Sequence, residues 1–469
     1  MATRRAAATA NRLNELLERA TLDTVIGPKY TGGRSRARTL SRGQCRCTRP
    51  EAGWPKGERV KKNRKFVSGA VLVAILAVLG VAQGMLDNAA AQAKQVPRFE
   101  VDPFWPKPMP NNEVFGQTIG LGISADDHVW IIHRGNDPGN LDNTERGINN
   151  GVRVSECCLP APPVVEFDPA GNRVGGWGGQ VAGAPYTWPG SNHGIVVDHK
   201  NFVWIGGNGP DDSHILKFTR DGKFVAQYGK SGARRDPKSP EGKPAYVSNS
   251  LDMENFGRVA KIFIDPKANE GYVSDGYLNK RVAVIDLDSG KIKRIWGAYG
   301  EPPTDAVLGP YDPAAPLPRQ FRTPMHCAEM SNDGMVYTCD RPNDRVQVFT
   351  SQGKFVAEYR IEPQTRADGS VWDIAFSKDP AQQFLYMADG ANEHVRVFDR
   401  KSMTELYNFG YGGRQPGMFL GVHSIAVDSK GNIYTTETYT GKRLQKFVYK
   451  GLGPAPKSSK VPAWPGVGN

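Results

Sequence analysis

Short runs of alternating apolar and polar residues, separated by turn residues, recur along the chain from about residue 114 to residue 450. The clearest example is 323–349, where a run that opens at His326 ends at the turn sequence NDG (332–334) and two β-branched or aromatic runs follow. Period-two alternation with Gly, Asn and Asp between the runs is typical of antiparallel strands joined by tight turns. The pattern therefore predicts an all-β protein.

The same pattern occurs six times, and most copies continue into a third strand and a fourth that ends in an aromatic residue and Gly. The six units begin at Gly120, His193, Lys261, His326, Asp373 and His423. Four short strands per unit is the sequence signature of a β-propeller. We predict a six-bladed β-propeller, with the PRFEVDPFW segment near Phe99 supplying the outer strand of the last blade. Three stretches are longer than ordinary loops and are expected to rim one face and shape a site, namely 136–162, 231–255 and 301–320.

The first 93 residues differ from the rest in charge. They carry 17 Lys and Arg against 6 Asp and Glu, a net charge of +11 out of +12 for the whole chain. Residues 94–469, the predicted propeller domain, are therefore nearly neutral and give no electrostatic case for a nucleic-acid partner. Residues 1–59 lack sustained apolar periodicity, which predicts a disordered basic leader.

Residues 60–93 have the order of a secretory signal: a basic run at 61–65, an apolar run at 66–82, and then the sequence AQA ending at Ala93. We predict cleavage after Ala93 and a periplasmic or secreted protein. The alternative is an uncleaved anchor, which would be the protein's only membrane contact. Because a signal normally begins a protein, one hypothesis is that translation starts at Val60, leaving 1–59 untranslated; peptides from that leader in mass spectrometry would contradict it.

Three histidines share one register of the repeat. Around the predicted ring, the register is filled in order by Ile119, His193, Ala260, His326, Trp372 and His423. Histidine thus occupies every second blade, at the start of the innermost strand, where side chains face the central channel. Three imidazoles related by about 120° would converge on one point and suit zinc with an open fourth position. The alternative is that each histidine caps or packs its own strand.

Two arginines and a tyrosine are expected above that point. Arg134 and Arg341 each lie four residues beyond the aromatic residue of a second strand, and in a third blade Gly276 stands at that place with Tyr277 directly after it. Arginine can clamp a carboxylate, and a tyrosine near cations can ionise more easily and act as a base. We therefore predict a substrate with a carboxylate, and we place His133 at the mouth of the site. The alternative is that these are surface loop residues in ion pairs.

Four cysteines follow the leader. The turn at 332–334 places Cys327 opposite Cys339, close enough for a cross-strand disulfide. Two buried free thiols are the alternative. Cys157 and Cys158 are the remaining pair, and the sequence does not choose among the possible pairings.

At these residues the sequence resembles the NHL-repeat propeller of the peptidyl-α-hydroxyglycine α-amidating lyases, over roughly 114–450. HRGN at His133 resembles a substrate-binding arginine motif and implicates Arg134, and CDRPNDRVQVF resembles a second motif and implicates Arg341. SNHGIVVD, PMHCAEMS and GVHSIAVD resemble the three zinc-histidine segments, which implicates His193, His326 and His423. VSDGYLNKRV resembles the segment of the catalytic tyrosine, here Tyr277.

The resemblance implies a zinc-dependent carbon–nitrogen lyase that converts a peptide or small-molecule α-hydroxyglycine to an amide and glyoxylate. It also implies a structural calcium, but Ser424 stands where the family has the calcium-binding Asp. Leu278 replaces the family's cysteine after the tyrosine, so that family disulfide is absent. Two other functions remain open: a non-catalytic NHL-repeat binding module, and a propeller hydrolase such as a calcium lactonase. The axial register lacks the Glu, Asn and Asp set that such lactonases use.

Overall fold

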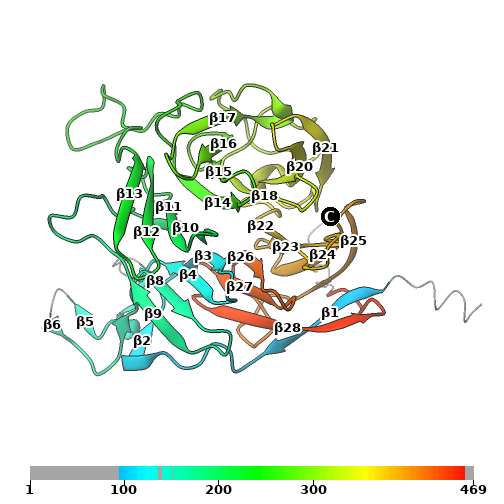
Figure 1. Ribbon diagram of the computed structural model, residues 1–469, viewed down its shortest axis with the longest axis horizontal. Helices are drawn as coiled ribbons and strands as arrows, with labels where there is room; N and C mark the ends of the chain where they lie inside the picture. Colours follow the sequence, from blue (N-terminus) through cyan, green and yellow to red (C-terminus); the bar gives the residue numbers. More distant parts are fainter. Residues whose placement is uncertain (1–94, 136–139, 150–151, 460–469) are drawn as a thin grey trace, which may run out of the picture. The chain divides into compact units, whose positions relative to one another are not determined.

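The computed structural model describes residues 95–135, 140–149 and 152–459. The described residues form six four-stranded antiparallel sheets that follow one another along the chain, as the repeat predicts. Figure 1 shows the sheets arranged around a common centre, with the first strand of each repeat innermost. The fold class is thus confirmed as a six-bladed β-propeller. The predicted leader and signal or anchor segment, 1–93, lie outside the described residues.

Within a blade, neighbouring strands in the chain are hydrogen-bonded neighbours in the sheet. The first three blades consist of β3 (Thr118–Ile123), β4 (Val129–His133), β8 (Val164–Phe167) and β9 (Arg173–Trp177); β10 (Asn192–Val197), β11 (Phe202–Gly207), β12 (His214–Thr219) and β13 (Phe224–Gly229); and β14 (Val259–Asp265), β15 (Glu270–Asp275), β16 (Arg281–Asp286) and β17 (Ile292–Trp296). The last three consist of β18 (Met325–Met330), β19 (Met335–Asp340), β20 (Arg345–Thr350) and β21 (Phe355–Arg360); β22 (Asp373–Phe376), β23 (Phe384–Asp389), β24 (His394–Asp399) and β25 (Thr404–Phe409); and β26 (Val422–Val427), β27 (Ile433–Glu437), β28 (Leu444–Gly453) and β1 (Val96–Asp102).

The remaining elements are short and belong to the loops. They are the strands β2 (Glu113–Val114), β5 (Ile148–Asn149), β6 (Val152–Arg153) and β7 (Leu159–Pro160), and the 3-10 turns η1 (Pro110–Asn112), η3 (Asn143–Glu145), η4 (Ala298–Gly300) and η5 (Arg341–Asn343). None of the helical turns in the part of the chain that the structure describes could cross a membrane.

The last blade is closed by a strand from the other end of the propeller. β1 pairs antiparallel with β28, with Phe99 opposite Tyr449, as predicted for the segment near Phe99. The Phe99 ring also lies 5.4 Å from the Tyr386 ring and 5.9 Å from the Phe409 ring of the neighbouring blade, measured between centroids. The strand that precedes the first repeat therefore completes the last blade as its outer strand.

The hydrophobic core lies between the blades. Six apolar clusters are present among the described residues, and each combines side chains from two neighbouring sheets. Between the second and third blades, for example, Trp204 and Ile215 pack with Val259 and Val273. Alternating strands bury side chains on both faces of a sheet when another sheet covers each face. Burial of this apolar surface holds the inner strands at fixed distances around the axis.

We expect Phe99→Ala to lower the free energy of unfolding by about 2 kcal/mol, less than the ~3–5 kcal/mol of a fully buried Phe, because Phe99 is only partly buried. Chemical denaturation monitored by circular dichroism would measure the change. Phe104→Ala is the matched control, since Phe104 is 75% exposed and its loss should leave stability unchanged. Equal stabilities of the two variants would contradict a closing role for β1.

Candidate metal centre

Three histidines from alternate blades meet at the propeller axis. His193, His326 and His423 lie on the inner strands β10, β18 and β26. Their ring centroids are 4.8 to 5.1 Å apart, and one ligand nitrogen from each lies within 4.8 Å of the others. All three are buried, with 2 to 3% of their surface exposed. The structure thus brings together the three residues that the shared register predicts to converge.

Each imidazole is oriented by a hydrogen bond to the next histidine-free blade. The Nδ1 atoms of His193, His326 and His423 lie 2.6, 2.5 and 3.0 Å from backbone carbonyl oxygens. Those carbonyls belong to Ala260, Trp372 and Ile119, the residues that fill the same register in the intervening blades. A carbonyl oxygen only accepts, so each Nδ1 carries the proton and each Nε2 carries a lone pair.

The electrostatic environment keeps these imidazoles neutral. Burial lowers the pKa of all three well below the ordinary histidine value, and the guanidinium group of Arg341 lowers each of them further. Arg134 acts in the same direction on the pKa of His193 and His423. A neutral imidazole whose Nδ1–H is bound to a carbonyl is the form that ligates zinc through Nε2. The three residues therefore fit zinc, with a fourth position left for another ligand.

The Tyr277 hydroxyl lies at the convergence point. Its Oη is 2.9 Å from His193 Nε2 and 3.1 Å from His326 Nε2. One hydroxyl proton can serve only one of these two lone pairs at a time. Tyr277 thus stands beside the nitrogens that would hold a metal, close to where a substrate atom would bind.

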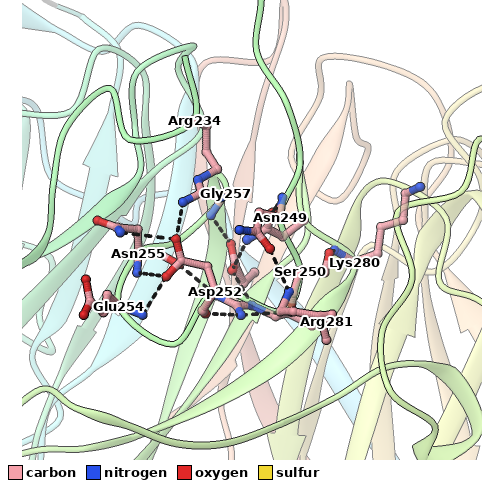
Figure 2. A network of polar contacts seen from close by, with 12 residues as sticks. Arg234, Asn249, Ser250, Asp252, Glu254, Asn255, Gly257, Lys280 and Arg281 are labelled. Carbon is pink, nitrogen blue, oxygen red and sulfur yellow. Dashed lines mark hydrogen bonds and ion pairs between the residues drawn. The ribbon is translucent and has the colours of Figure 1, made fainter. Parts of the chain in front are cut away.

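A buried polar network fixes the segment that bears Tyr277. The fully buried Arg281 donates to the Asp275 carboxylate (2.8 Å), and also to the carbonyls of Ser250 and Asn255, both at 2.9 Å. Figure 2 shows Arg281 reaching into the long loop 231–255. In that loop Asp252 accepts hydrogen bonds from neighbouring backbone amides and from Arg234.

The two long loops beside the site also contact each other. The Ser250 hydroxyl in 231–255 donates to Asp305 in 301–320 at 2.6 Å, and Lys280 donates to the Ala306 carbonyl at 2.7 Å. These loops therefore meet beside the segment that bears Tyr277.

The same Asp–Arg arrangement places Arg341. In the next blade Arg345 donates to the Asp340 carboxylate at 2.6 and 2.9 Å, and both side chains are fully buried. Arg341 begins the turn between them, and its guanidinium lies 4.3 Å from the centre of the Trp372 ring. Its Nε is buried and has no hydrogen-bond partner. A buried donor without a partner is uncommon and is consistent with a site for an anionic ligand.

Arg134 reaches the site from the first blade. Its guanidinium donates to the carbonyl of Asn192, which directly precedes His193, and to the side chains of Gln117 and Asn208, at 2.9 to 3.1 Å. These bonds hold the charge beside His193. The structure therefore gathers Arg134, Arg341 and Tyr277 around the three histidines rather than leaving them as separate surface residues.

Burial has the largest effect on the pKa of the Tyr277 hydroxyl and leaves it raised above the ordinary tyrosine value, although Arg341 and then Arg134 lower it, as expected for a tyrosine near cations. The expectation for His133 is wrong. His133 does not line the mouth of the site but is fully buried. Its Nε2 donates to the Pro162 carbonyl at 2.9 Å, and its Nδ1 accepts from the backbone amide of Gly135 at 2.9 Å. His133 therefore fixes the turn that carries Arg134.

Two disulfides join the four cysteines that lie within the described residues. Cys327 and Cys339 are joined across β18 and β19, with their Cα atoms 4.8 Å apart, and Cys157 is joined to Cys158 in the long loop of the first blade. Cys327 directly follows His326, so its bond ties a proposed ligand strand to its neighbour.

Two residues that contact the site have no role predicted from the sequence. The Trp372 ring lies 5.6 Å from the His423 ring and 6.2 Å from the His326 ring, in addition to its contact with Arg341. Asp368 lies 3.5 Å from Arg341 and accepts a 2.9 Å hydrogen bond from the Tyr439 hydroxyl. The aromatic residue in the histidine register was the only available signal for Trp372. Asp368 belongs to a loop of ordinary length and had none.

Comparison with known proteins shows a distant relationship. No family model matches the chain. It is 24% identical over 269 residues to peptidyl-glycine alpha-amidating monooxygenase B of Xenopus laevis, a match that covers 56% of this chain and 26% of that protein. It is 28% identical over 178 residues to the peptidylglycine alpha-amidating monooxygenase of Rattus norvegicus, covering 35% of this chain and 17% of that protein. The chain thus spans about a quarter or less of the length of these relatives.

Similar solved structures include a streptogramin B lyase, with 13% identity, a TM-score of 0.42, and coverage of 75% of this chain and 98% of that one. Another is an inactive virginiamycin B lyase from Staphylococcus aureus, with 14% identity, a TM-score of 0.39, and coverage of 75% and 89%.

Purified residues 94–469 are expected to bind about one zinc per chain, because three neutral Nε2 atoms share one point. The triple variant His193→Ala/His326→Ala/His423→Ala should bind none, as measured by elemental analysis after incubation with zinc and dialysis. His199→Ala is the matched control, since His199 is exposed and should leave the zinc content unchanged. Equal zinc content in the triple variant and the wild type would contradict an axial metal site.

Acid should destabilise the protein partly through His133, whose pKa is lowered to about 4 by burial. The unfolded chain binds a proton near pH 6.5 and the folded chain only near pH 4, so stability is lost as the pH falls between these values. The shift corresponds to about 3 kcal/mol. The free energy of unfolding should be measured by denaturation at pH 7 and pH 4 with a chelator present. Between these two pH values, His133→Gln should lose about 3 kcal/mol less of that free energy than the wild type. Equal losses would contradict a neutral buried His133.

Proposed function

We propose that this chain is an exported, zinc-dependent lyase that cleaves the C–N bond of an α-hydroxyglycine-type substrate to give an amide and glyoxylate. The observation that carries the proposal is the convergence of three neutral imidazoles beside the Tyr277 hydroxyl, with two arginines nearby. The distant similarity to amidating monooxygenases supports the same chemistry. Export would depend on the signal-like segment at 60–93, and cleavage there would give a periplasmic or secreted protein.

The three histidines would hold the metal through Nε2, since each Nδ1 is already bonded to a carbonyl. When bound, zinc supplies a Lewis acid that stabilises negative charge developing on a substrate oxygen. The Nδ1–H···O bonds keep the ring planes in place as the ligand set forms, which lowers the cost of reorganisation.

Arg134 and Arg341 would bind the carboxylate that becomes part of glyoxylate. Arg341 offers a buried Nε–H that has no partner within the protein, and both arginines act electrostatically on Tyr277. Guanidinium groups recognise carboxylates through paired, charge-assisted hydrogen bonds. Binding there would place the α-carbon of the substrate between the arginines and the histidines, within reach of Tyr277 Oη.

Tyr277 Oη would accept the proton of the substrate α-hydroxyl. The oxygen lone pair then forms the carbonyl of glyoxylate, the C–N bond breaks, and the leaving amide nitrogen takes up the proton that Tyr277 received. Tyrosine must be ionised to accept a proton. Burial opposes this ionisation, whereas Arg341 and Arg134 favour it, and a metal on the histidines would act in the same direction as the arginines.

The test is glyoxylate release from an α-hydroxyglycine-extended peptide. Tyr277→Phe should lower kcat by about 10²- to 10⁴-fold, the range of general acid–base catalysis, with little change in KM. Tyr411→Phe is the matched control, because Tyr411 is 50% exposed and should keep wild-type rates. Wild-type kinetics for Tyr277→Phe would refute its role, and zinc binding without any turnover would favour a non-catalytic binding propeller.

Arg134→Ala should raise KM and lower kcat, with kcat/KM reduced by roughly 10- to 100-fold, because a charge-assisted hydrogen bond contributes about 1.5–3 kcal/mol. An analogue whose carboxylate is replaced by a neutral amide separates this role from general damage. The wild type should prefer the carboxylate substrate strongly, and Arg134→Ala should keep only the part of that preference that Arg341 supplies. An unchanged preference in the variant would contradict carboxylate recognition by Arg134.

A further inference from the structure

A charged cluster lies in the axial channel, one residue further along the inner strands than the histidine register. A narrow cavity there is lined by Gly120, Gly194, Lys261, Asp373 and Ser424. Each directly follows a residue of the histidine register. Lys261 and Asp373 are the charged members of this layer.

Lys261 is bound by two carboxylates from other blades. Its Nζ lies 2.7 and 2.9 Å from the two carboxylate oxygens of Asp373 and 2.8 Å from Glu329 Oε1. The side chains of Lys261, Asp373 and Glu329 are 16%, 1% and 13% exposed. Asp373 also accepts from the backbone amides of Ile374 and Ile425, at 2.9 and 3.0 Å. The ammonium is thus held by three blades at the centre of the ring.

A buried carboxylate needs a compensating cation, because removing it from water without one costs several kcal/mol. A calcium ion would need six to eight oxygen ligands at 2.3–2.6 Å. The point where Asp373 and Glu329 converge is already taken by the Lys261 ammonium. In the same layer Ser424 offers a hydroxyl, and its Oγ is within 3.2 Å of His423 Nδ1. These residues do not fit calcium.

The ion pair between Lys261 and Asp373 also joins two chain segments whose backbone carbonyls orient the histidines. Lys261 directly follows Ala260, whose carbonyl accepts the His193 Nδ1–H. Asp373 directly follows Trp372, whose carbonyl accepts the His326 Nδ1–H. A bond between Lys261 and Asp373 therefore couples the positions of these two acceptor carbonyls across the channel.

We propose that the Lys261 ammonium is a built-in cation that takes the place of a bound calcium ion in the axial channel, so that the protein is stable without calcium. The inference concerns the channel alone and holds whether or not the histidines bind zinc. It follows that removing the ammonium should leave Asp373 and Glu329 as an unpaired pair of carboxylates able to bind a divalent cation.

The first test is the calcium content and thermal stability of purified residues 94–469. After dialysis against a calcium chelator and then against about 1 mM calcium, the wild type should retain no stoichiometric calcium, and its Tm should be unaffected by the ion. Retention of about one calcium per chain, or a Tm that rises with calcium concentration, would overturn the proposal.

The second test is Lys261→Met, whose Tm without calcium should fall by roughly 5 °C or more. Added calcium should then raise that Tm, whereas the Tm of the wild type should not change over the same calcium concentrations. Lys261→Arg keeps the positive charge and should show no calcium response. Lys261→Met/Asp373→Asn removes both charges of the pair. Its Tm without calcium should fall less than that of Lys261→Met, and added calcium should change its Tm little.

A calcium response of Lys261→Met no larger than that of the double variant would overturn the proposal. If Lys261→Met can be purified only when calcium is supplied, that result supports the proposal. If the variant cannot be purified with or without calcium, the calcium content of the wild type decides. Activity is not a readout in any arm, so these outcomes are independent of the lyase assays.

Discussion

The site depends on three hydrogen bonds that cross from one blade to the next, from each histidine Nδ1 to a carbonyl of the following inner strand. Each such bond contributes only about 1 kcal/mol, much less than the apolar clusters between the blades. Their importance is therefore orientation rather than stability. They leave every Nε2 lone pair directed to the axis, and they do so only while the ring is closed, because each acceptor belongs to a different sheet.

The turns that follow the second strands show how one structural device can present different chemistry. In the third blade a buried Asp–Arg pair holds the turn, and in the fourth blade a second buried Asp–Arg pair does the same. The first turn carries Tyr277 and the second carries Arg341. Buried ion pairs gain little net stability after desolvation, and each of these pairs joins two residues that flank its turn. The residue at the tip is then free to differ between blades.

Charge is layered along the axis. Arg134 and Arg341 lie on one side of the neutral histidines, and Lys261 with Asp373 and Glu329 lies on the other. The arginines favour an anionic ligand above the histidines, whereas in the second layer the Lys261 ammonium is already paired with two acidic side chains.

The sequence by itself determined the six blades, the closing strand near Phe99 and the alternation of histidines, because period-two patterning and repeated landmarks fix which residues share a register. Only the tertiary structure decided which atom of each imidazole faces the axis, that His133 is a buried support for Arg134, and that burial raises the pKa of Tyr277. It also decided the pairing of Lys261 with Asp373, which are 112 residues apart. Register is encoded locally, whereas desolvation and contacts between blades depend on what surrounds a group in space, and no local pattern records that.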